Sequence, residues 1–301
     1  MAGPLREVES ALRCPVCAAD LAVAADHRSL HCGASHRFDI ARQGYVSLID
    51  GRSTNHLSDT AQMVAARRRV HDSGFFGVVS DVVADVIGRA ATENTAVRST
   101  GDPDGLDLVL DAGAGTGHYL AAALDRAPGL HGLGLDLSKY CARSVARSHP
   151  RAASVVADVW RPLPIRSSSI GAVLSVFSPR NVDEFVRVLH PRGILVVVTP
   201  NADHLGEIIA PMGMLAVGAD KDDRLRSALA GEFEVCSETV VGDRRSLDAD
   251  AIVDVVAMGP TAFHRSPGQI RSDADLVITE ADGPVDVSVS VTVTTCRPRR
   301  R

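Results

Sequence analysis

Three of the six cysteines in this 301-residue chain lie within its first 32 residues. Cys14 and Cys17 form a C-x2-C pair, and Cys32 and His36 form a second pair with three residues between them. Structural zinc is held in a tetrahedron by four thiolate or imidazole ligands, and two such pairs supply the ligands from two sides of the ion. Because the protein would fill all four positions, we predict a closed, structural zinc site formed by Cys14, Cys17, Cys32 and His36.

The alternatives to this site concern the fourth ligand and the C-x2-C pair. His27 and His31 are the other histidines nearby, but His31 directly precedes Cys32 and is expected to point away from an ion bound by that thiolate. A redox-active C-x2-C pair is the second alternative, but the strand-helix-strand context of such motifs is missing here.

A second group of residues with chemical potential begins where an apolar run ends at Asp111. The sequence D-x-G-x-G-x-G then places Gly113, Gly115 and Gly117, and His118 follows. Glycines let a ligand approach the backbone closely, and the start of the next helix offers free N–H groups. We therefore predict that all five residues line a cofactor site, although nicotinamide enzymes use a similar loop.

Two later acids narrow the choice of cofactor. Asp136 ends a strand-like segment about 20 residues beyond the loop, where a carboxylate can bind two ribose hydroxyls. Asp158 ends the next such segment, where it can accept a hydrogen bond from an exocyclic amino group, and Val159 follows it. The loop together with both acids resembles the pattern of the class I methyltransferases, which use S-adenosylmethionine.

The elements that must position these residues alternate between strand and helix. The predicted strands span 108–111, 132–136, 154–158, 170–176 and 194–199. The predicted helices between them span 119–126, 138–148 and 182–189. This alternation predicts an α/β fold, a doubly wound parallel sheet with its ligand site at the strand carboxyl ends. Later helices at 211–230 and 249–258 accompany strands at 233–241 and 285–295, which should form an antiparallel hairpin that closes the sheet.

We expect three parts in the chain. Residues 1–45 form the small zinc-binding module, residues 46–100 a helical linker, and residues 101–301 the class I methyltransferase domain. A module of this size cannot bury enough apolar surface to fold alone, so the metal must supply the missing stability.

The charge distribution indicates where a nucleic acid could bind. The formal net charge of −5 excludes a basic surface over the whole chain. Residues 1–75 carry nine arginines against eight carboxylates, whereas the rest carries 23 basic against 29 acidic residues. We therefore expect any RNA contact near the contiguous Arg67, Arg68 and Arg69, with a solvated helix face as the alternative.

No run of 18 apolar residues and no signal-peptide pattern is found in the sequence. We expect a cytoplasmic protein without a membrane partner, in a compartment where thiols stay reduced.

Several short motifs resemble one family along almost the whole chain. They are Leu12-Arg-Cys-Pro-Val-Cys17, His36-Arg-Phe-Asp39, Gly44-Tyr-Val-Ser-Leu48 and Phe177-Ser-Pro-Arg180. With the zinc ligands, they resemble the RlmA family of 23S rRNA guanine-N1 methyltransferases, which includes macrolide-resistance enzymes of antibiotic producers. The resemblance implies zinc, S-adenosylmethionine and methyl transfer to N1 of a guanine in a 23S rRNA hairpin.

Such a reaction requires removal of the proton from guanine N1. Asp111, Asp183 and Glu184 are the candidate bases, because a carboxylate near the site can accept that proton. Arg180 is the candidate for stabilising charge on the guanine O6, with a surface arginine as the alternative.

Two other classes of function stay open at this point. One is a small-molecule methyltransferase of natural-product biosynthesis with a structural zinc module, and the other is an adaptor that binds the cofactor without chemistry. The sequence does not tell which guanine is modified, whether the role is housekeeping or resistance, or whether the chain forms a homodimer.

Overall fold

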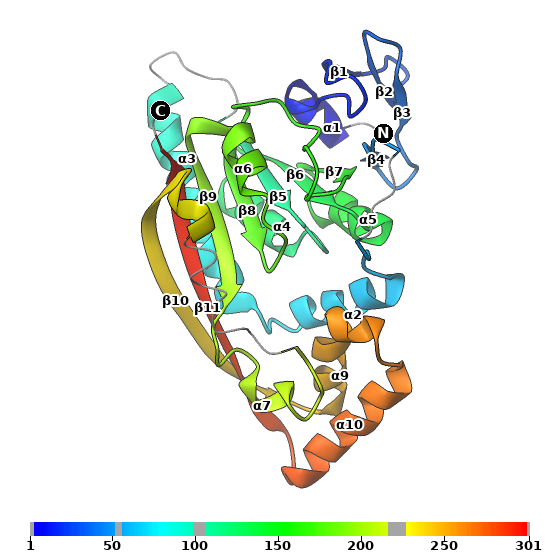
Figure 1. Cartoon of the computed structure of the whole chain (residues 1–301), viewed down its shortest axis with the longest axis vertical. Helices are drawn as coiled ribbons and strands as arrows, with labels where there is room; N and C mark the ends of the chain where they lie inside the picture. Colours follow the sequence, from blue (N-terminus) through cyan, green and yellow to red (C-terminus); the bar gives the residue numbers. More distant parts are fainter. Residues whose placement is uncertain (1–2, 52–55, 99–105, 216–226, 300–301) are drawn as a thin grey trace.

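The computed structural model describes residues 3–51, 56–98, 106–215 and 227–299 (Figure 1). Its centre is an eight-stranded sheet in the order β10-β11-β9-β8-β5-β6-β7-β4. Pairing is parallel from β9 to β4, whereas β11 is antiparallel to both β9 and β10. The predicted doubly wound sheet and its closing antiparallel hairpin are therefore confirmed.

The strands of the large sheet carry the sequence patterns expected of their positions. Central strands are buried along their whole length, as parallel strands covered on both faces must be. The strands are β4 (Tyr45–Ser47), β5 (Leu108–Ala112), β6 (His131–Asp136), β7 (Ala152–Val156), β8 (Ile170–Val176), β9 (Leu189–Pro200), β10 (Phe233–Leu247) and β11 (Val285–Pro298).

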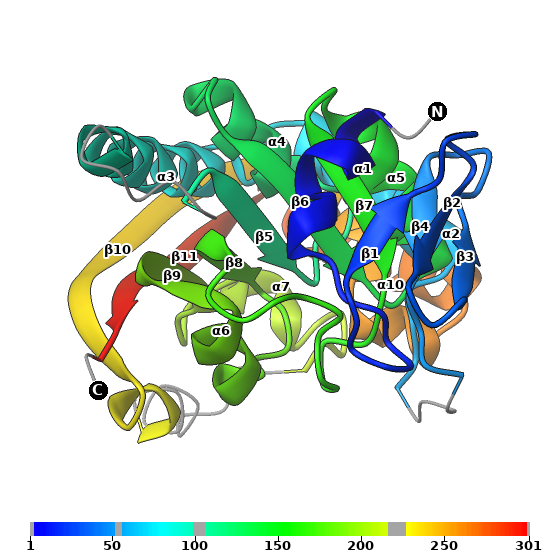
Figure 2. The ribbon, with the colours of Figure 1, turned by 90° about the horizontal axis from the view of Figure 1, so that it is seen from above.

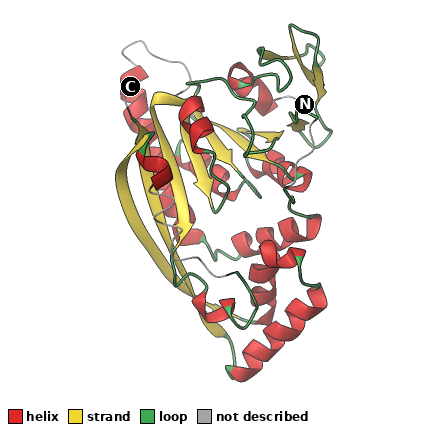
Figure 3. Ribbon diagram, in the orientation of Figure 1, coloured by secondary structure: helices red, strands yellow, loops and turns green. Residues whose placement is uncertain are grey.

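Helices cover both faces of this sheet, and a further group of helices lies beyond one end of its strands. They are α1 (Gly3–Val8), α2 (Ala61–Asp72), α3 (Gly77–Arg98), α4 (His118–Arg126), α5 (Lys139–Ser148), α6 (Val182–Val188), α7 (Gly206–Ile209), α9 (Ala249–Ala257) and α10 (Pro267–Glu280), with 3-10 turns at Glu9–Ala11 and Pro260–Phe263. Figure 3 shows α2, α9 and α10 gathered below the central strands. In the described part of the chain, no helix has both the length and the apolar character needed to cross a bilayer.

The N-terminal module is a three-stranded antiparallel sheet of β1 (Leu21–Val23), β2 (Ser29–Cys32) and β3 (Arg37–Asp39). Figure 2 shows it beside β4, on the side of the molecule away from β10. Strand β4 pairs with β7, so the large sheet crosses the boundary at residue 45 that we expected. The module and one face of the large sheet share a continuous core.

The described part of segment 46–100 packs against the main body instead of forming a separate linker. The side chains of Phe76, Val83 and Ile87 are buried in one cluster with Leu120 and Leu124 of α4. Helix α2 begins after Thr60, whose hydroxyl accepts a hydrogen bond from the Met63 N–H and so caps the helix.

Two expectations for the C-terminal part need correction. The predicted helix 211–230 is not continuous, because residues 211–213 form a turn after α7; residues 216–226 lie outside the described ranges. Helix α10 was not predicted, although Ser266 and Gln269 form a capping box in front of it and Pro267 occupies its first position.

Candidate functional site

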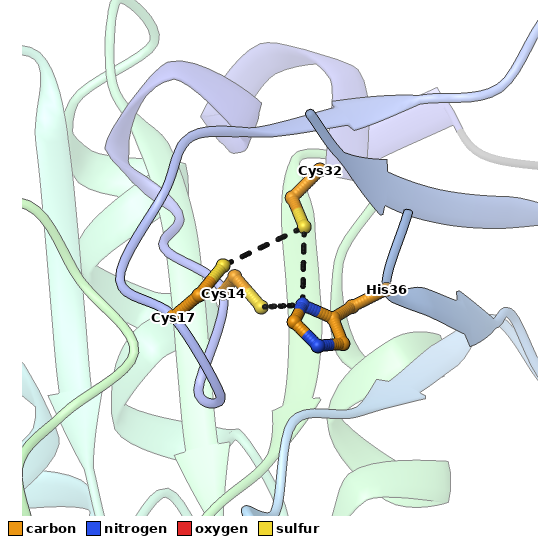
Figure 4. Close-up of side chains that lie close together, drawn as sticks. All are labelled: Cys14, Cys17, Cys32 and His36. Carbon is orange, nitrogen blue, oxygen red and sulfur yellow. Dashed lines mark hydrogen bonds between the residues drawn. The ribbon is translucent and has the colours of Figure 1, made fainter. Parts of the chain in front are cut away.

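The four predicted zinc ligands come together in the structure (Figure 4). Their ligand atoms all lie within 4.8 Å of one another. The Cys17 and Cys32 sulfur atoms are 3.7 Å apart, and the His36 Nδ1 lies 3.4 Å from the Cys32 sulfur and 3.6 Å from that of Cys14. Zn–S bonds of about 2.3 Å in a tetrahedron place two sulfur atoms about 3.8 Å apart, so the cluster has the dimensions of a zinc site.

Local turns explain why these side chains converge. The Ala18 N–H donates to the Cys14 carbonyl, and the Ser35 N–H donates to that of Cys32, which closes a tight turn behind each pair. Burial raises the pKa of the Cys32 thiol, but hydrogen bonds from the His36 and Ala34 backbone outweigh it and lower the pKa to about 6. A thiolate is the form that binds zinc, so this position is prepared for the metal.

The zinc module is joined to the loop that follows β7. The Arg13 N–H donates to the Pro164 carbonyl, and the Arg166 N–H donates to the Ala11 carbonyl, at 2.9 and 2.7 Å. A cavity of about 360 Å³ lies between the two parts and is lined by Pro15 of the zinc turn and by Asp158. Asp158, a predicted cofactor residue, therefore shares this cavity with the zinc turn.

The glycine loop contributes Gly113 to the lining of a second cleft, at the carboxyl ends of the central strands. Gly113 and Gly115 have φ values of +86° and +54°, in the left-handed region that favours glycine. A Cβ atom on Gly113 would lie 2.6 Å from the Ser178 Cβ, and one on Gly115 would lie 3.1 Å from an Arg67 nitrogen. The tight loop therefore needs glycine at both positions.

The two predicted strand-end acids accept hydrogen bonds from backbone N–H groups at this cleft. Asp136 accepts hydrogen bonds from the N–H groups of Gly115 and Ser138, at 2.9 and 2.8 Å. Asp158 accepts one from the Trp160 N–H at 3.0 Å and lies at the same cleft, as does Val159. The predicted ribose and adenine positions are thus neighbours in space.

Two carboxyl groups at the glycine loop have unusual acidity. Burial, with the nearby charge of Asp136, raises the pKa of Asp111 to about 7. Burial also raises the pKa of Asp136 to about 6, against the effect of its two N–H donors. One Asp111 oxygen is buried without a hydrogen-bond partner among the described residues. Such a group suits a cationic ligand, and the methionine part of S-adenosylmethionine carries an ammonium and a sulfonium.

Arg67 lies in this cleft and not on the RNA-facing surface that we expected. Its guanidinium forms an ion pair with Asp59, donates to the Met258 carbonyl at 2.8 Å, and lines the cleft beside Gly113 and Asp136. The signal available for this position was the helical spacing of Arg67 from the buried Met63 and Val70. Its neighbours do point outward: Arg68 donates to Ser144, and Arg69 forms a two-point ion pair with Asp254.

The remaining predicted site residues do not line the cleft. The His118 ring stacks on His71 with 4.2 Å between ring centroids, and it does not line the cleft. Glu184 accepts from the Leu163 N–H and pairs with Arg187, so its carboxylate is engaged in holding the loop after β7 and is unsuited to act as a base. Asp183 is exposed, Arg180 is half-buried, and neither lines the cleft.

Several residues of the cleft wall were not predicted from the sequence. The segment after β8 contributes Phe177, Ser178 and Pro179, and the other side is formed by His56 and Trp160. Asp59 also lines the cleft and forms the ion pair with Arg67. Only the position of the Phe-Ser-Pro-Arg motif after a strand could have indicated part of this wall.

Comparison with known proteins finds two matching families. The family described as "RlmA, N-terminal" matches residues 12–51, and the family described as "Methyltransferase domain" matches residues 110–197. The first match contains all four zinc ligands, and the second contains the glycine loop and both strand-end acids. These matches confirm the predicted zinc module, fold class and cofactor type.

Full-length relatives extend the similarity beyond these two segments. A Streptomyces fradiae protein named 23S rRNA (guanine(748)-N(1))-methyltransferase is 44% identical over 287 residues, covering 95% of this chain and 96% of that protein. A Micromonospora griseorubida protein, assigned provisionally to the 23S rRNA (guanine-N(1)-)-methyltransferases, is 42% identical over 95% of this chain and 97% of its own length. A Bacillus subtilis protein with a provisional name of the same kind is 33% identical over 66% of this chain and 67% of its own length.

Replacing Arg67 with alanine is expected to weaken binding of S-adenosylmethionine by about 10-fold or more, because a charged hydrogen-bond donor is lost from the cleft. Titration calorimetry measures this directly. Arg67→Lys should retain part of the affinity, and Arg69→Ala, two positions away on the outer face, should retain all of it. Normal cofactor affinity in Arg67→Ala, with weakened RNA binding, would restore the surface role that the sequence suggested.

Cofactor binding is expected to strengthen as the pH rises from 6 to 8. Burial raises the folded pKa of Asp111 to about 7 and that of Asp136 to about 6, so at pH 6 Asp111 is mostly and Asp136 about half protonated, and both ionise toward pH 8. Without ligand, these raised pKa values cost stability as the pH rises from the unfolded value of about 4 to the folded values of about 6 and about 7, and a bound cation offsets that cost. We expect about a fivefold to tenfold gain in affinity, flattened in Asp111→Asn. An equal affinity at both pH values would contradict this account.

Proposed function

Because the chain belongs to the family of the 23S rRNA (guanine-N1)-methyltransferases, we propose that it transfers a methyl group from S-adenosylmethionine to N1 of a guanine in 23S rRNA. The observation that carries the proposal is the similarity of 44% identity over 95% of the chain, which includes both the zinc module and the methyltransferase domain. A small-molecule methyltransferase is the alternative, but the full-length relatives carry rRNA names.

The chain's own residues would bind and position the two substrates. Asp136 and Asp158 face the ribose and adenine ends, and Asp111 and Arg67 face the amino acid end. S-adenosylmethionine supplies the electrophilic methyl group on its sulfonium, so the protein must hold guanine N1 in line with it and exclude competing positions. Asp183 and Arg180 remain the proposed groups for the N1 proton and the O6 charge; neither lines the cleft, but both closely follow Ser178 and Pro179, which do.

The finer parts of the proposal concern the RNA. We infer that the target is a guanine in a hairpin of 23S rRNA, equivalent to the position in the name of the Streptomyces fradiae relative, and that its methylation reduces macrolide binding. Single-stranded loops are the parts of RNA whose bases can be turned out into a protein site. Arg68 and Arg69 are exposed on α2 and are the proposed phosphate contacts.

The activity can be tested with purified protein and labelled S-adenosylmethionine. Unmodified 23S rRNA should become labelled, and digestion to nucleosides should yield 1-methylguanosine. Asp136→Ala serves as the control for background transfer. Labelling of small molecules without labelling of RNA, or a methyl group at another guanine position, would refute the proposal.

A further inference from the structure

An exposed aromatic ring stands beside the glycine loop at the carboxyl end of β8. Phe177 is 40% exposed and lines the cleft, although phenylalanine is usually buried. Its φ value of +51° lies in the left-handed region, which is costly for a bulky side chain and is often found where a site requires it. The conformation therefore directs a hydrophobic ring into the cleft at a cost in backbone energy.

The segment that carries this ring is anchored against the glycine loop. The Ser178 hydroxyl donates to the Ala112 carbonyl at 2.6 Å, and the Phe177 N–H donates to the Val198 carbonyl at 3.3 Å. Since a Cβ on Gly113 would overlap Ser178, no space separates this segment from the loop. Phe177 thus borders the part of the cleft where the methionine end of the cofactor and its methyl group belong.

Two buried rings support Phe177 from behind. His204 stacks on it with 5.7 Å between centroids and 23° between planes, and Phe76 lies at 5.6 Å. The His204 Nδ1 accepts a hydrogen bond from the Ser290 N–H on β11, and burial lowers the pKa of this histidine to about 4, so the ring is neutral at physiological pH. The group forms a rigid platform with one ring facing the cleft.

The other exposed aromatic ring of the cleft lies elsewhere. Trp160 follows Asp158 after β7, is 51% exposed, and stacks on His56 at 5.9 Å. Its position beside Asp158 places it at the adenine side, so it does not compete for the methyl-acceptor position. Phe177 is the ring that borders the methyl-transfer end.

We propose that Phe177 is the stacking platform for the acceptor guanine, holding the turned-out base flat against the platform so that its N1 faces the methyl group. This inference rests on the function proposed above. An enzyme that acts on a base must hold it outside the RNA stack, and aromatic side chains do so by stacking on its face. The edge of the base then stays free for the reaction.

The test compares Phe177→Ala, Phe177→Leu and Phe177→Tyr in methyl transfer to unmodified 23S rRNA. Phe177→Ala and Phe177→Leu should lower kcat by about 10-fold to 100-fold with little change in KM for RNA, because phosphate contacts dominate overall RNA affinity. Phe177→Tyr keeps the ring and should stay within about threefold of the unsubstituted chain. Leucine is the matched control for apolar volume, so it separates stacking from packing.

Two further measurements make the outcomes distinct. Calorimetry should show unchanged affinity for S-adenosylmethionine in all three variants, and thermal unfolding should show a folded protein. Full activity of Phe177→Leu, or an equal loss of cofactor affinity, would overturn the stacking role while leaving the proposed function intact. Absence of methyl transfer to rRNA by the unsubstituted chain would overturn both.

Discussion

Replacing His36 with alanine is expected to lower the zinc content from about one ion per chain to well below one and to destabilise the N-terminal module by several kcal/mol. The ligand atoms of Cys14, Cys17, Cys32 and His36 surround one point, and loss of one ligand leaves three thiolates in an incomplete tetrahedron. Metal analysis and thermal unfolding measure the two effects. His31→Ala is the matched control, since this exposed histidine lies on β2 beside Cys32 without contributing to the cluster.

The same substitution should also weaken binding of S-adenosylmethionine. The module is tied by Arg13 and Arg166 to the loop after β7, and the zinc turn shares a cavity wall with Asp158. Loosening the module therefore loosens the adenine side of the cleft. A zinc-free variant with unchanged stability and cofactor affinity would show that the cluster is not a structural metal site.

Replacing Asp136 with alanine is expected to weaken binding of S-adenosylmethionine by about 1.5–3 kcal/mol, or roughly 10-fold to 150-fold. Two effects add here. The carboxylate that should bind the ribose hydroxyls is removed, and the Gly115 N–H loses the acceptor that fixes the loop. Asp136→Asn retains one carbonyl oxygen as an acceptor, so its loss should be smaller.

Calorimetric titration of both variants separates these contributions. Glu280→Gln is the control for a general change in charge, because Glu280 is an exposed residue at the end of α10 that does not line the cleft. Unchanged affinity in Asp136→Ala would remove this residue from the cofactor site. Equal losses in the alanine and asparagine variants would assign the whole effect to the negative charge.

Local sequence patterns predicted the zinc ligands, the glycine loop and the strand-end acids. Each of these depends on short spacing along the chain: Cys14 and Cys17 share one turn, and Asp136 ends its own strand. The parallel sheet followed from the alternation of apolar runs with helical segments, since crossover connections leave few arrangements. These features need no knowledge of distant contacts.

Features that depend on distant contacts could not be predicted in the same way. Strand β4 has only three residues, which is too short to show the alternation of apolar and polar residues that marks a strand. It joins the sheet by pairing with the edge strand β7. Three contiguous arginines on α2 look alike in sequence, yet only Arg67 shares the inward helix face with the buried Met63 and Val70, at spacings of four and three residues. That periodicity was the signal available for its place in the cleft.

The role of Phe177 also depends on contacts between residues that are distant in the sequence. The sequence marks a motif after the fourth central strand, but the exposure of the ring depends on its backbone conformation and on the packing of His204 and Phe76 behind it. His204 comes from a segment after β9 and Phe76 from the turn before α3, so no local pattern brings the three rings together.

The most direct test of the account is reverse transcription across 23S rRNA from cells that express this chain and from matched cells that lack it. Methylation at N1 blocks Watson–Crick pairing, so the account predicts one new strong stop next to a single guanine, absent with the Asp136→Ala variant. Identical stop patterns in the presence and absence of the active protein would contradict the account.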